Sequence, residues 1–404
     1  MLENKNTMDT EKHTRPQVVV IGSADVIKLC VIRALGTFGC DVDVVHLSKV
    51  PNKRMMPVDY YSKFVRHYFL VNSNNLIQFL LEKYHGFDTK VVVFTLDDNS
   101  TALIDNAQEQ LGSIFHFAHL KSGQHIVSMM NKHLLKEKAA RVGMNVVAGW
   151  PIPYENGEFY IPDGIQYPCF VKGLFSNYNS KHVQCQCKDE QELRHLLDSC
   201  KKHYPHSVYA EEFIPIEKDF GVIGVCDGKK CIIPARADLL VLGKGSTNGV
   251  SMLGKVSPFD KNTELYKQIE SMLADLRYVG IFNFDFVESK GKIFFVELNF
   301  RFAAYGYGVF CAGVNLPAMF VRSVLLGQFN EDSNEVTSLN QDYYYLNEKI
   351  VLTNVLEKSI TWSKYRALKK QADFLLVNDS GDPKPYKMFK RTFVLKYIKK
   401  TIGK

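Results

Sequence analysis

The segment GIFNFDFVESKGKIFFVELNFR (280–301) consists of two long apolar runs joined by a short polar turn, and a few polar residues interrupt the runs. This pattern predicts a hairpin of two antiparallel strands. Asp285 lies in the first strand, and Glu297 and Asn299 lie in the second, two residues apart and therefore on one face. A carboxylate among Phe, Val, Ile and Leu is costly unless it is paired or bound to a cation. Buried side chains of this kind would therefore need a partner.

Two carboxylates and an amide oxygen on one face would make a site of hard oxygen ligands. Mg²⁺ bound to a phosphate group suits such a site, because Mg²⁺ takes few protein ligands and several phosphate or water oxygens. Arg301 falls on the same face and can neutralise charge on a phosphate or a carboxylate. The alternative is a half-exposed hairpin whose polar face simply meets water. The spacing alone does not decide between the two.

Strands and helices alternate in the first part of the chain. Apolar runs predict buried strands at 17–23, 42–47 and 91–94, and helical periodicity predicts helices at 27–38, 76–84 and 101–111. The alternation is typical of an open parallel sheet, so we expect an α/β domain over 15–125, after a disordered leader at 1–14. The first turn, IGSADV, has one glycine where the dinucleotide-binding fingerprint needs three, which argues against NAD binding.

A polar group formed by Asp97, Asp98 and Asn99 follows the third of these strands. It lies at the carboxyl end of the strand, where open parallel sheets bind ligands. The group is either a polar loop that caps the next helix or a contact to a substrate, and the sequence leaves both interpretations open.

Further along the chain, two lysines and three acids lie at positions suited to a nucleotide. Lys172 ends the apolar strand CFVKG (169–173), and Lys132 lies near a helix start. Either lysine could reach a phosphate as a point charge, although lysines at such positions are usually solvated. Glu211, Glu212 and Asp219 surround a turn that contains proline. Acids there suit a ribose hydroxyl or an adenine amino group, and the alternative is a charged strand edge.

In their order and context, these segments resemble the ATP-grasp family. That family holds ATP between two α+β subdomains, usually after a small α/β domain, and here the resemblance places the ATP-grasp domain at 126–330. The segment GVNLPAMFVRSVLLG (313–327) resembles the closing helix of the carbamoyl-phosphate-synthase type. The resemblance implies roles residue by residue: ATP lysines at Lys132 and Lys172, an adenine contact by the Glu211 side chain and by the backbone of Glu212 and Ile214, a ribose contact at Asp219, metal ligands at Asp285, Glu297 and Asn299, and the arginine that follows them at Arg301.

The outline is similar to bacterial D-aspartate ligases and related carboxylate–amine ligases. This resemblance implies ATP and Mg²⁺ as cofactors, with Mn²⁺ as an alternative metal. It implies joining of a small-molecule acid and an amine through an acyl phosphate, with release of ADP and phosphate. By the same analogy the product would be a cell-wall or surface-glycan precursor carrying an added amino acid. Many members of the family are dimers, so a homodimer is one alternative, and the sequence leaves the oligomeric state open. Another ATP-grasp carboxylase or kinase activity and a non-catalytic nucleotide-binding regulatory protein stay open as alternatives.

Arg236 ends the strand KCIIPAR (230–236). Within the family resemblance, Arg236 is a candidate for binding the substrate carboxylate or the acyl phosphate. The alternative is a surface ion pair with Asp238.

Three features depart from the family pattern. Gly173 follows the lysine strand where the family usually has proline. The phosphate loop SNYNSKH (176–182) contains no glycine, so its backbone approaches phosphates less freely. Phe300 replaces the usual proline between the asparagine and the arginine, which leaves the chemical residues in place.

The chain of 404 residues has a net charge of +7 and a pI near 8.7. This mild excess suits anionic ligands such as nucleotides and does not require nucleic acid as a partner. The sequence contains no apolar run of membrane-spanning length and no secretory signal at its N-terminus, which favours the cytoplasm. The nine cysteines, without CxxC spacing, are then most simply free thiols.

A C-terminal extension at 331–404 ends in a basic tail, with eight Lys or Arg and no acid from Lys384 to Lys404. Apolar residues alternate with these cations in YKMFKRTFVLKYIKK (386–400). Such a segment can lie on the anionic inner surface of a membrane or hold an anionic, lipid-linked substrate. The alternative is a helix packed on the body of the protein with a solvated basic face.

Overall fold

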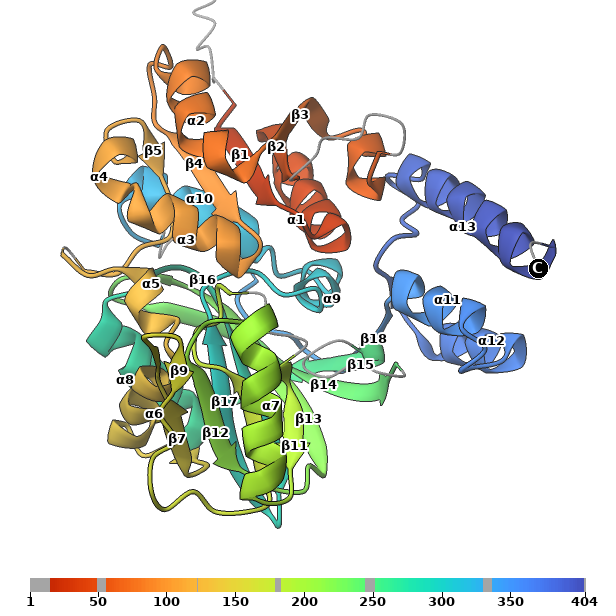
Figure 1. Ribbon diagram of the computed structural model, residues 1–404. Helices are drawn as coiled ribbons and strands as arrows, with labels where there is room; N and C mark the ends of the chain where they lie inside the picture. The colour runs from red at the N-terminus through yellow and green to blue at the C-terminus, as the bar shows by residue number, and fades with distance from the viewer. Residues whose placement is uncertain are drawn as a thin grey trace, which may run out of the picture.

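The computed structural model describes residues 15–48, 56–121, 123–178, 183–243, 251–329 and 336–402. The expected leader at 1–14 and residues 179–182 of the expected phosphate loop lie outside these ranges. In Figure 1 the N-terminal part lies above a larger, mainly antiparallel sheet, and the C-terminal helices lie to one side. None of the helices within the described ranges is both long and apolar enough to cross a bilayer.

The N-terminal part is an open parallel sheet with strand order β3-β2-β1-β4-β5. Its strands are Gln17–Gly22 (β1), Asp41–Leu47 (β2), Val65–Val71 (β3), Val91–Thr95 (β4) and Phe115–His116 (β5). The associated helices are Asp25–Phe38 (α1), Leu76–Tyr84 (α2), Asp98–Asn106 (α3) and Gln108–Leu111 (α4), with 3-10 turns at Val58–Tyr61 (η1) and Ser73–Asn75 (η2). Every residue of β1 is buried, because apolar clusters cover both faces of the sheet.

The central sheet has eight strands in the order β19-β18-β15-β14-β13-β16-β17-β6. They are Asn145–Val146 (β6), Lys218–Asp227 (β13), Cys231–Leu242 (β14), Ser251–Pro258 (β15), Val279–Ser289 (β16), Lys292–Asn299 (β17), Tyr343–Leu346 (β18) and Phe374–Leu375 (β19). Helices Lys132–Arg141 (α6) and Glu264–Leu276 (α8) pack with the aromatic residues of one face, and the short helix Ile126–Met129 (α5) joins the same cluster. The hairpin predicted at 280–301 is present in this sheet as the antiparallel strands β16 and β17.

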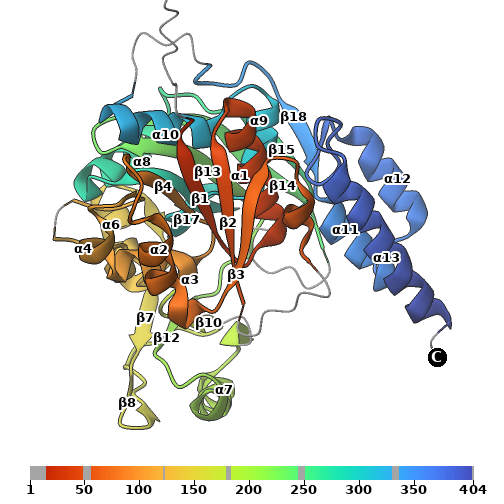
Figure 2. The same ribbon diagram turned by 90° about the horizontal axis from the view of Figure 1, so that it is seen from above.

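A smaller sheet of four strands has the order β11-β10-β12-β7. Its strands are Gly149–Ile152 (β7), Cys169–Gly173 (β10), Cys185–Cys187 (β11) and Val208–Glu212 (β12), and the helix Glu190–His203 (α7) covers one face. A hairpin of Tyr154–Glu155 (β8) and Glu158–Phe159 (β9) follows β7. In Figure 2, α7 and β8 lie at the lower edge of the molecule. The other face of this small sheet carries Lys172 and Glu211.

The remaining helices are Gly306–Cys311 (α9), Leu316–Leu326 (α10), Glu348–Leu356 (α11), Trp362–Gln371 (α12) and Lys384–Ile402 (α13). One large core joins α1 and the parallel sheet to α9, α10 and the central sheet. Arg33 of α1 fixes the chain after α12, because its guanidinium binds the Asp382 carboxylate at 3.1 Å and the carbonyl oxygens of Leu376 and Val377. The two strands β18 and β19 show that the extension after residue 330 contributes to the central sheet.

Candidate active site

The three predicted metal ligands lie together on one face of the β16–β17 pair. Asp285 pairs directly with Glu297, and Asn283 pairs with Asn299. A β-bulge follows, because the next paired residues are Phe286 and Phe295. The extra residue in β17 lets Phe295 enter the aromatic core while Glu297 faces the site. The convergence predicted from sequence spacing is therefore present in the structure.

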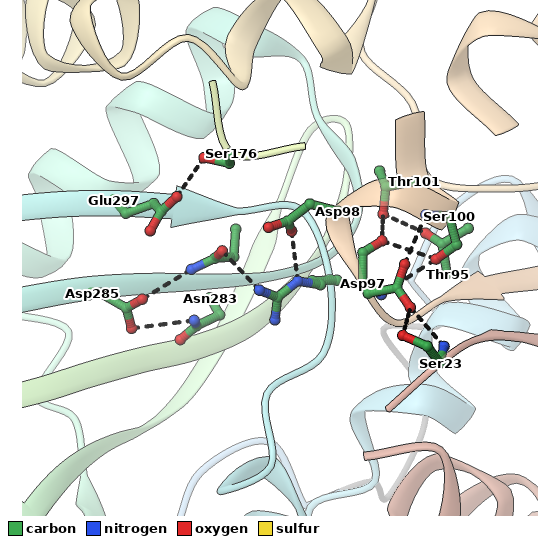
Figure 3. Close-up of polar contacts among 12 residues, drawn as sticks. Ser23, Thr95, Asp97, Asp98, Ser100, Thr101, Ser176, Asn283, Asp285 and Glu297 are labelled. Atoms are coloured by element: carbon green, nitrogen blue, oxygen red, sulfur yellow. Dashed lines mark hydrogen bonds and ion pairs between the residues drawn. The ribbon is translucent and has the colours of Figure 1, made fainter. Parts of the chain in front are cut away.

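A chain of hydrogen bonds runs from Asp285 to the N-terminal domain (Figure 3). The Asn283 and Asn299 amides donate to the two oxygens of Asp285, at 3.2 and 2.9 Å. Nη2 of Arg301 donates to Oδ1 of Asn299 at 3.2 Å, and Nε of Arg301 donates to Oδ1 of Asp98 at 2.7 Å. The side chain of Arg301 is thus held between the predicted metal site and the parallel sheet.

The charge balance around Asp285 favours a bound cation. Burial, together with the charges of Glu297 and Asp219, raises the pKa of Asp285 to about 7. Oδ1 of Asn283 is buried and has no hydrogen-bond partner within the described chain. A divalent cation would offset the carboxylate charge and give such oxygens a partner. Two carboxylates with amide oxygens fit Mg²⁺, and the structure holds no cluster of three or more His, Cys, Asp or Glu side chains suited to a metal in its described ranges.

Glu297 has partners of its own. The Lys132 ammonium donates to Oε1 of Glu297 at 3.0 Å and to Oγ of Ser176 at 2.7 Å, and Ser176 donates to the same carboxylate oxygen at 2.5 Å. Burial alone would raise the pKa of Glu297, but Lys132 and Ser176 outweigh it and bring the pKa to about 2. Asn131 caps α6 and fixes the position of Lys132 at its first turn. One predicted ATP lysine and the first residue of the phosphate loop therefore meet a predicted metal ligand.

A second ionic cluster surrounds Glu211 on the small sheet. In the register of β10 and β12, Glu211 pairs with Phe170, and Lys172 lies two residues along the same face. The carboxylate accepts hydrogen bonds from Lys172 at 2.8 Å and from Lys136 of α6 at 2.5 Å. Burial opposes ionisation of Glu211, but the two lysines lower its pKa to about 2. Burial lowers the pKa of Lys136 to about 8, although Glu211 acts in the opposite direction.

Lys136 was not among the residues predicted from the sequence. It lies one helical turn after Lys132 in α6, so both lysines project from the same side of the helix. That spacing was the available signal. The spacing predicts that both lysines project from one side of the helix, but it does not predict which sheet that side of the helix faces.

The predicted adenine and ribose residues lie beside a cavity and on the site face of the central sheet. A cavity of about 230 Å³ is lined by Glu212 and Ile214, together with Val146, Ala148 and Phe294. Asp219 pairs with Val287, two residues from Asp285 in β16, and therefore shares its face. The cavity thus lies between the turn after β12 and the β16–β17 hairpin, and Asp219 lies outside its lining.

Arg236 is not brought together with the other candidates. It pairs with Val222 of β13, which pairs with Phe284 of β16, so Arg236 lies on the face opposite Asp285. Its guanidinium binds Asp238 at 2.7 Å and Glu288 at 2.9 Å, and it stacks over the ring of Phe220. The ion pair with Asp238, which was the alternative interpretation, is present. We therefore leave Arg236 out of the proposed site.

Asp97 and Asp98 have different partners in the N-terminal domain. Asp97 caps α3 through Ser100 and accepts hydrogen bonds from the backbone and hydroxyl of Ser23, at 2.7 and 3.0 Å (Figure 3). The helix-cap interpretation is thus correct for Asp97. Asp98 instead binds Arg301. The acidic loop after β4 therefore reaches the site through an arginine.

Tyr305 is a further residue of the site that the sequence did not reveal. The residue is only 4% exposed, and its hydroxyl has no hydrogen-bond partner in the described part of the chain. The hydroxyl lies against Gly221, which pairs with Asp285. No local pattern marks Tyr305, since it follows β17 in a segment rich in aromatic residues.

Comparison with known proteins adds evidence at the level of the fold. No family model matches the sequence, and no curated protein matches it. Solved structures do match: an N5-carboxyaminoimidazole ribonucleotide synthetase bound to ADP has a TM-score of 0.61 and 14% identity, covering 85% of this chain and 85% of its own. The L-amino acid ligase from Bacillus licheniformis has a TM-score of 0.59 and 14% identity, covering 82% of this chain and 79% of its own.

A third match is the biotin carboxylase domain of the Hydrogenobacter thermophilus 2-oxoglutarate carboxylase, in complex with MgADP, ADP and bicarbonate. Its TM-score is 0.59 at 16% identity, covering 82% of this chain and 74% of its own. The structural matches establish the fold. Because the sequence identities are this low, they leave the substrates open. The parallel sheet, the two α+β parts and these matches together show that the chain has the ATP-grasp fold, which confirms the fold that the sequence resemblance implied.

Proposed function

We propose that this protein is an ATP-dependent carboxylate–amine ligase, which forms an amide through an acyl phosphate and releases ADP and phosphate. The observation that carries the proposal is the convergence of Asp285, Glu297 and Asn299 on one face of an ATP-grasp sheet, next to Lys132 and Arg301. A cavity beside Glu212 and Ile214 supports a nucleotide at the neighbouring turn.

Each side chain has a distinct task in this reaction. Lys172 and Lys132 offset phosphate charge, and Lys132 exchanges its bond to Glu297 for a phosphate oxygen when ATP binds. The Glu211 carboxylate, held ionised by its two lysines, accepts a hydrogen bond from the adenine amino group. Asp219 accepts hydrogen bonds from the ribose.

The reacting groups meet near Arg301. The substrate carboxylate attacks the γ-phosphate, the amine then displaces phosphate from the acyl phosphate, and Arg301 stabilises the negative charge that develops in both steps. Asp98 fixes the orientation of Arg301, so no reorganisation is needed at the moment of reaction. Mg²⁺ held by Asp285, Glu297 and Asn299 would supply charge neutralisation to the ATP phosphates.

The same site argues against a purely regulatory role. Nucleotide binding alone would need only the lysines and the turn after β12. Asp285 is an additional, partly buried carboxylate, and burial raises its pKa. Such a group is expected where chemistry requires it, since it works against stability without a cation. The glycine-free loop after Ser176 is the feature that favours the regulatory alternative.

The proposal is tested by measuring phosphate release from ATP and Mg²⁺ with a panel of amino acids, each alone and with amine acceptors. We expect release that depends on one acid and one amine, with a product mass equal to their sum less water. Release that needs bicarbonate instead of an amine would identify a carboxylase. Nucleotide binding without turnover for any pair, including lipid-linked acceptors, would favour the regulatory alternative.

We propose further that the C-terminal helices approach an anionic surface, so that the acceptor is a cell-wall or surface-glycan precursor at a membrane. All charged residues of α12 and α13 are basic. Near the end of α13, Val394, Leu395 and Ile398 are exposed, and Trp362 of α12 contacts Tyr397. Basic and aromatic residues around exposed aliphatic ones are typical of segments that bind anionic lipid.

Sedimentation with vesicles tests this part of the proposal. We expect binding to vesicles that contain phosphatidylglycerol and little binding to pure phosphatidylcholine, with loss of binding in Leu395→Glu/Ile398→Glu. Binding should weaken at high salt because part of it is electrostatic. Absence of binding to either kind of vesicle would mean that α13 is only a structural helix with a solvated basic face.

A further inference from the structure

The Tyr305 hydroxyl is a buried polar group that lacks a partner in the described chain. Only 4% of Tyr305 is exposed, and its ring belongs to the large core that joins the two sheets. An unpaired buried hydroxyl costs free energy, and a phenylalanine would fill the same space without that cost. The hydroxyl therefore calls for a partner beyond the residues that the structure describes, and a bound ligand can supply it.

The position of the hydroxyl places it beside the predicted metal site. A Cβ atom added at Gly221 would overlap the Tyr305 hydroxyl oxygen, so the hydroxyl lies directly on strand β13 at that glycine. Gly221 pairs with Asp285 of β16, and directly paired residues share a face. The hydroxyl is therefore next to Asp285 on the face that carries the site.

Arg301 approaches Asp285 from the other side. Strand β16 lies between β13 and β17 in the central sheet. Arg301 follows β17 and donates to Asn299, which donates to Asp285. Tyr305 comes only four residues later in the same segment, yet it crosses to the β13 side. One segment of chain thus places a cationic donor and a neutral donor on opposite sides of one carboxylate.

The chemistry of the two donors fits an anionic oxygen. Burial, with the charges of Asp285 and Asp219, holds the pKa of Tyr305 well above its ordinary value, so the hydroxyl stays protonated and can donate. Arg301 remains charged at any physiological pH. A carboxylate or a phosphate accepts hydrogen bonds from both kinds of donor. The negative charge of Asp285 would oppose such a ligand unless a cation is bound with it.

We propose that the Tyr305 hydroxyl and the Arg301 guanidinium form an oxyanion subsite, which binds the carboxylate of the acid substrate before the reaction and phosphate after it. This inference rests on the proposed ligase function and adds the group that orients the acid. The hydroxyl acts as a positioning donor, because it neither gives up nor takes a proton in the reaction.

The test uses inorganic phosphate, which is a product of the proposed reaction, as the probe. Calorimetry would measure phosphate binding to the full-length protein saturated with ADP and Mg²⁺. We expect Tyr305→Phe to weaken phosphate binding about tenfold or more, because one hydrogen bond to a charged ligand is lost, while ADP affinity stays the same.

A matched control is available in Tyr278, another buried tyrosine. Its hydroxyl donates to the Ile281 carbonyl oxygen at 2.7 Å, within the core on the opposite face. Tyr278→Phe should lower Tm and leave phosphate binding unchanged. Tyr305→Phe should leave the Tm of the ligand-free protein unchanged or raise it, since it removes an unpaired hydroxyl.

Weaker phosphate binding without a lower Tm in Tyr305→Phe, together with a lower Tm and unchanged phosphate binding in Tyr278→Phe, would support the subsite. Equal phosphate affinity in the wild type and in Tyr305→Phe would overturn it, as would a drop in Tm for Tyr305→Phe equal to that of Tyr278→Phe. Failure of the wild-type protein to bind ADP would overturn the ligase proposal and the subsite together. ADP binding without any phosphate binding would overturn the subsite alone.

Discussion

Glu211 and Asp285 are both partly buried carboxylates of the candidate site, yet their pKa values shift in opposite directions. Two lysines lower the pKa of Glu211 to about 2, whereas burial and neighbouring carboxylates raise that of Asp285 to about 7. The region around Glu211 carries its own counter-charges. In the region around Asp285, only amides donate to the carboxylate among the described residues. One region is complete as folded, and the other is balanced only when a cation binds.

This contrast has a physical basis in where the partners come from. Lys136 reaches Glu211 from α6, and Lys172 reaches it from the same sheet, so folding alone assembles the cluster. A buried ion pair contributes little net stability, but loss of one partner is strongly destabilising. A partly buried carboxylate without a cation works against stability and is retained for function. Substitutions in the two regions should therefore have opposite effects on stability and activity.

The largest expected effect is on turnover in Asp285→Asn. We expect a loss of about a thousandfold or more in ATP-dependent phosphate release, because the metal site loses a charged ligand. Stability at neutral pH should not fall, since the amide removes a carboxylate that lacks a counter-charge. Asp238→Asn, in the same sheet but on the opposite face, is the matched control and should keep its activity. Full activity in Asp285→Asn would show that Asp285 is not a metal ligand.

Glu211→Gln should have the next largest effect, on the free energy of unfolding. It leaves Lys136 and Lys172 beside a neutral amide, which should cost about 3 kcal/mol. Denaturant unfolding would measure this loss, with Glu190→Gln as the control. Glu190 forms an exposed ion pair with Arg194, so its replacement should change stability by only about 0.5 kcal/mol.

A second substitution sharpens the same prediction. Lys136→Met combined with Glu211→Gln should recover part of the lost stability, because one of the two unpaired cations is removed. A loss below about 1 kcal/mol in Glu211→Gln alone would mean that water solvates these lysines and that the cluster is not a closed ionic unit.

Much of the metal region could be predicted from the sequence because its residues are local. Asp285, Glu297 and Asn299 lie in one hairpin, and the two-residue period of a strand fixes their relative faces. The helix that carries Lys132 and the strand that ends near Lys172 follow from hydrophobic periodicity in the same way. These features depend on residues that are close together in the sequence, so the sequence of one chain is enough to predict them.

The features that the sequence did not reveal depend on distant partners. Periodicity shows that Arg236 and Asp238 share a face, but only the register between β14 and β13 shows which face that is. Lys136 and Tyr305 acquire their roles from contacts with β12 and with Gly221. Strand β18 joins the central sheet by pairing with β15, about ninety residues earlier in the chain. No short-range pattern encodes such pairings.

The pH dependence of stability should also separate the two regions. The pKa of Asp285 rises from 3.8 in the unfolded chain to about 7 in the folded protein, so the folded state binds more protons between these values. Stability of the ligand-free wild type relative to Asp285→Asn should therefore fall as pH rises from about 4 to 7. The full shift corresponds to about 4 kcal/mol, and solvent screening at this partly exposed group reduces the expected loss to about 2 kcal/mol. Urea unfolding in EDTA across this range would measure it.

Glu211 provides the contrasting profile. Its pKa is lowered from 4.5 to about 2, so its contribution is present above the unfolded value and is lost only as pH falls toward 2. Over the range in which Asp285 titrates, the Glu211 cluster should contribute little to the change of unfolding free energy with pH. Bound Mg²⁺ and ADP should remove the pH dependence that Asp285 causes. A slope that persists in saturating Mg²⁺ and ADP would show that no cation binds at Asp285.

The smallest expected effect concerns Asp98, which connects the N-terminal domain to the metal region. Asp98→Asn keeps the shape of the side chain but weakens the charge-assisted bond to Nε of Arg301, which measures 2.7 Å. We expect kcat to fall about tenfold while ADP affinity stays unchanged, because Arg301 loses its orientation and not its charge.

The adjacent Asp97 is the matched control, since it caps α3 and does not contact Arg301. Asp97→Asn should reduce stability by about 1 kcal/mol with little change in kcat. If Asp98→Asn lowered stability and spared kcat as well, Asp98 would belong with the self-contained region around Glu211, and the arginine would need no support from the parallel sheet.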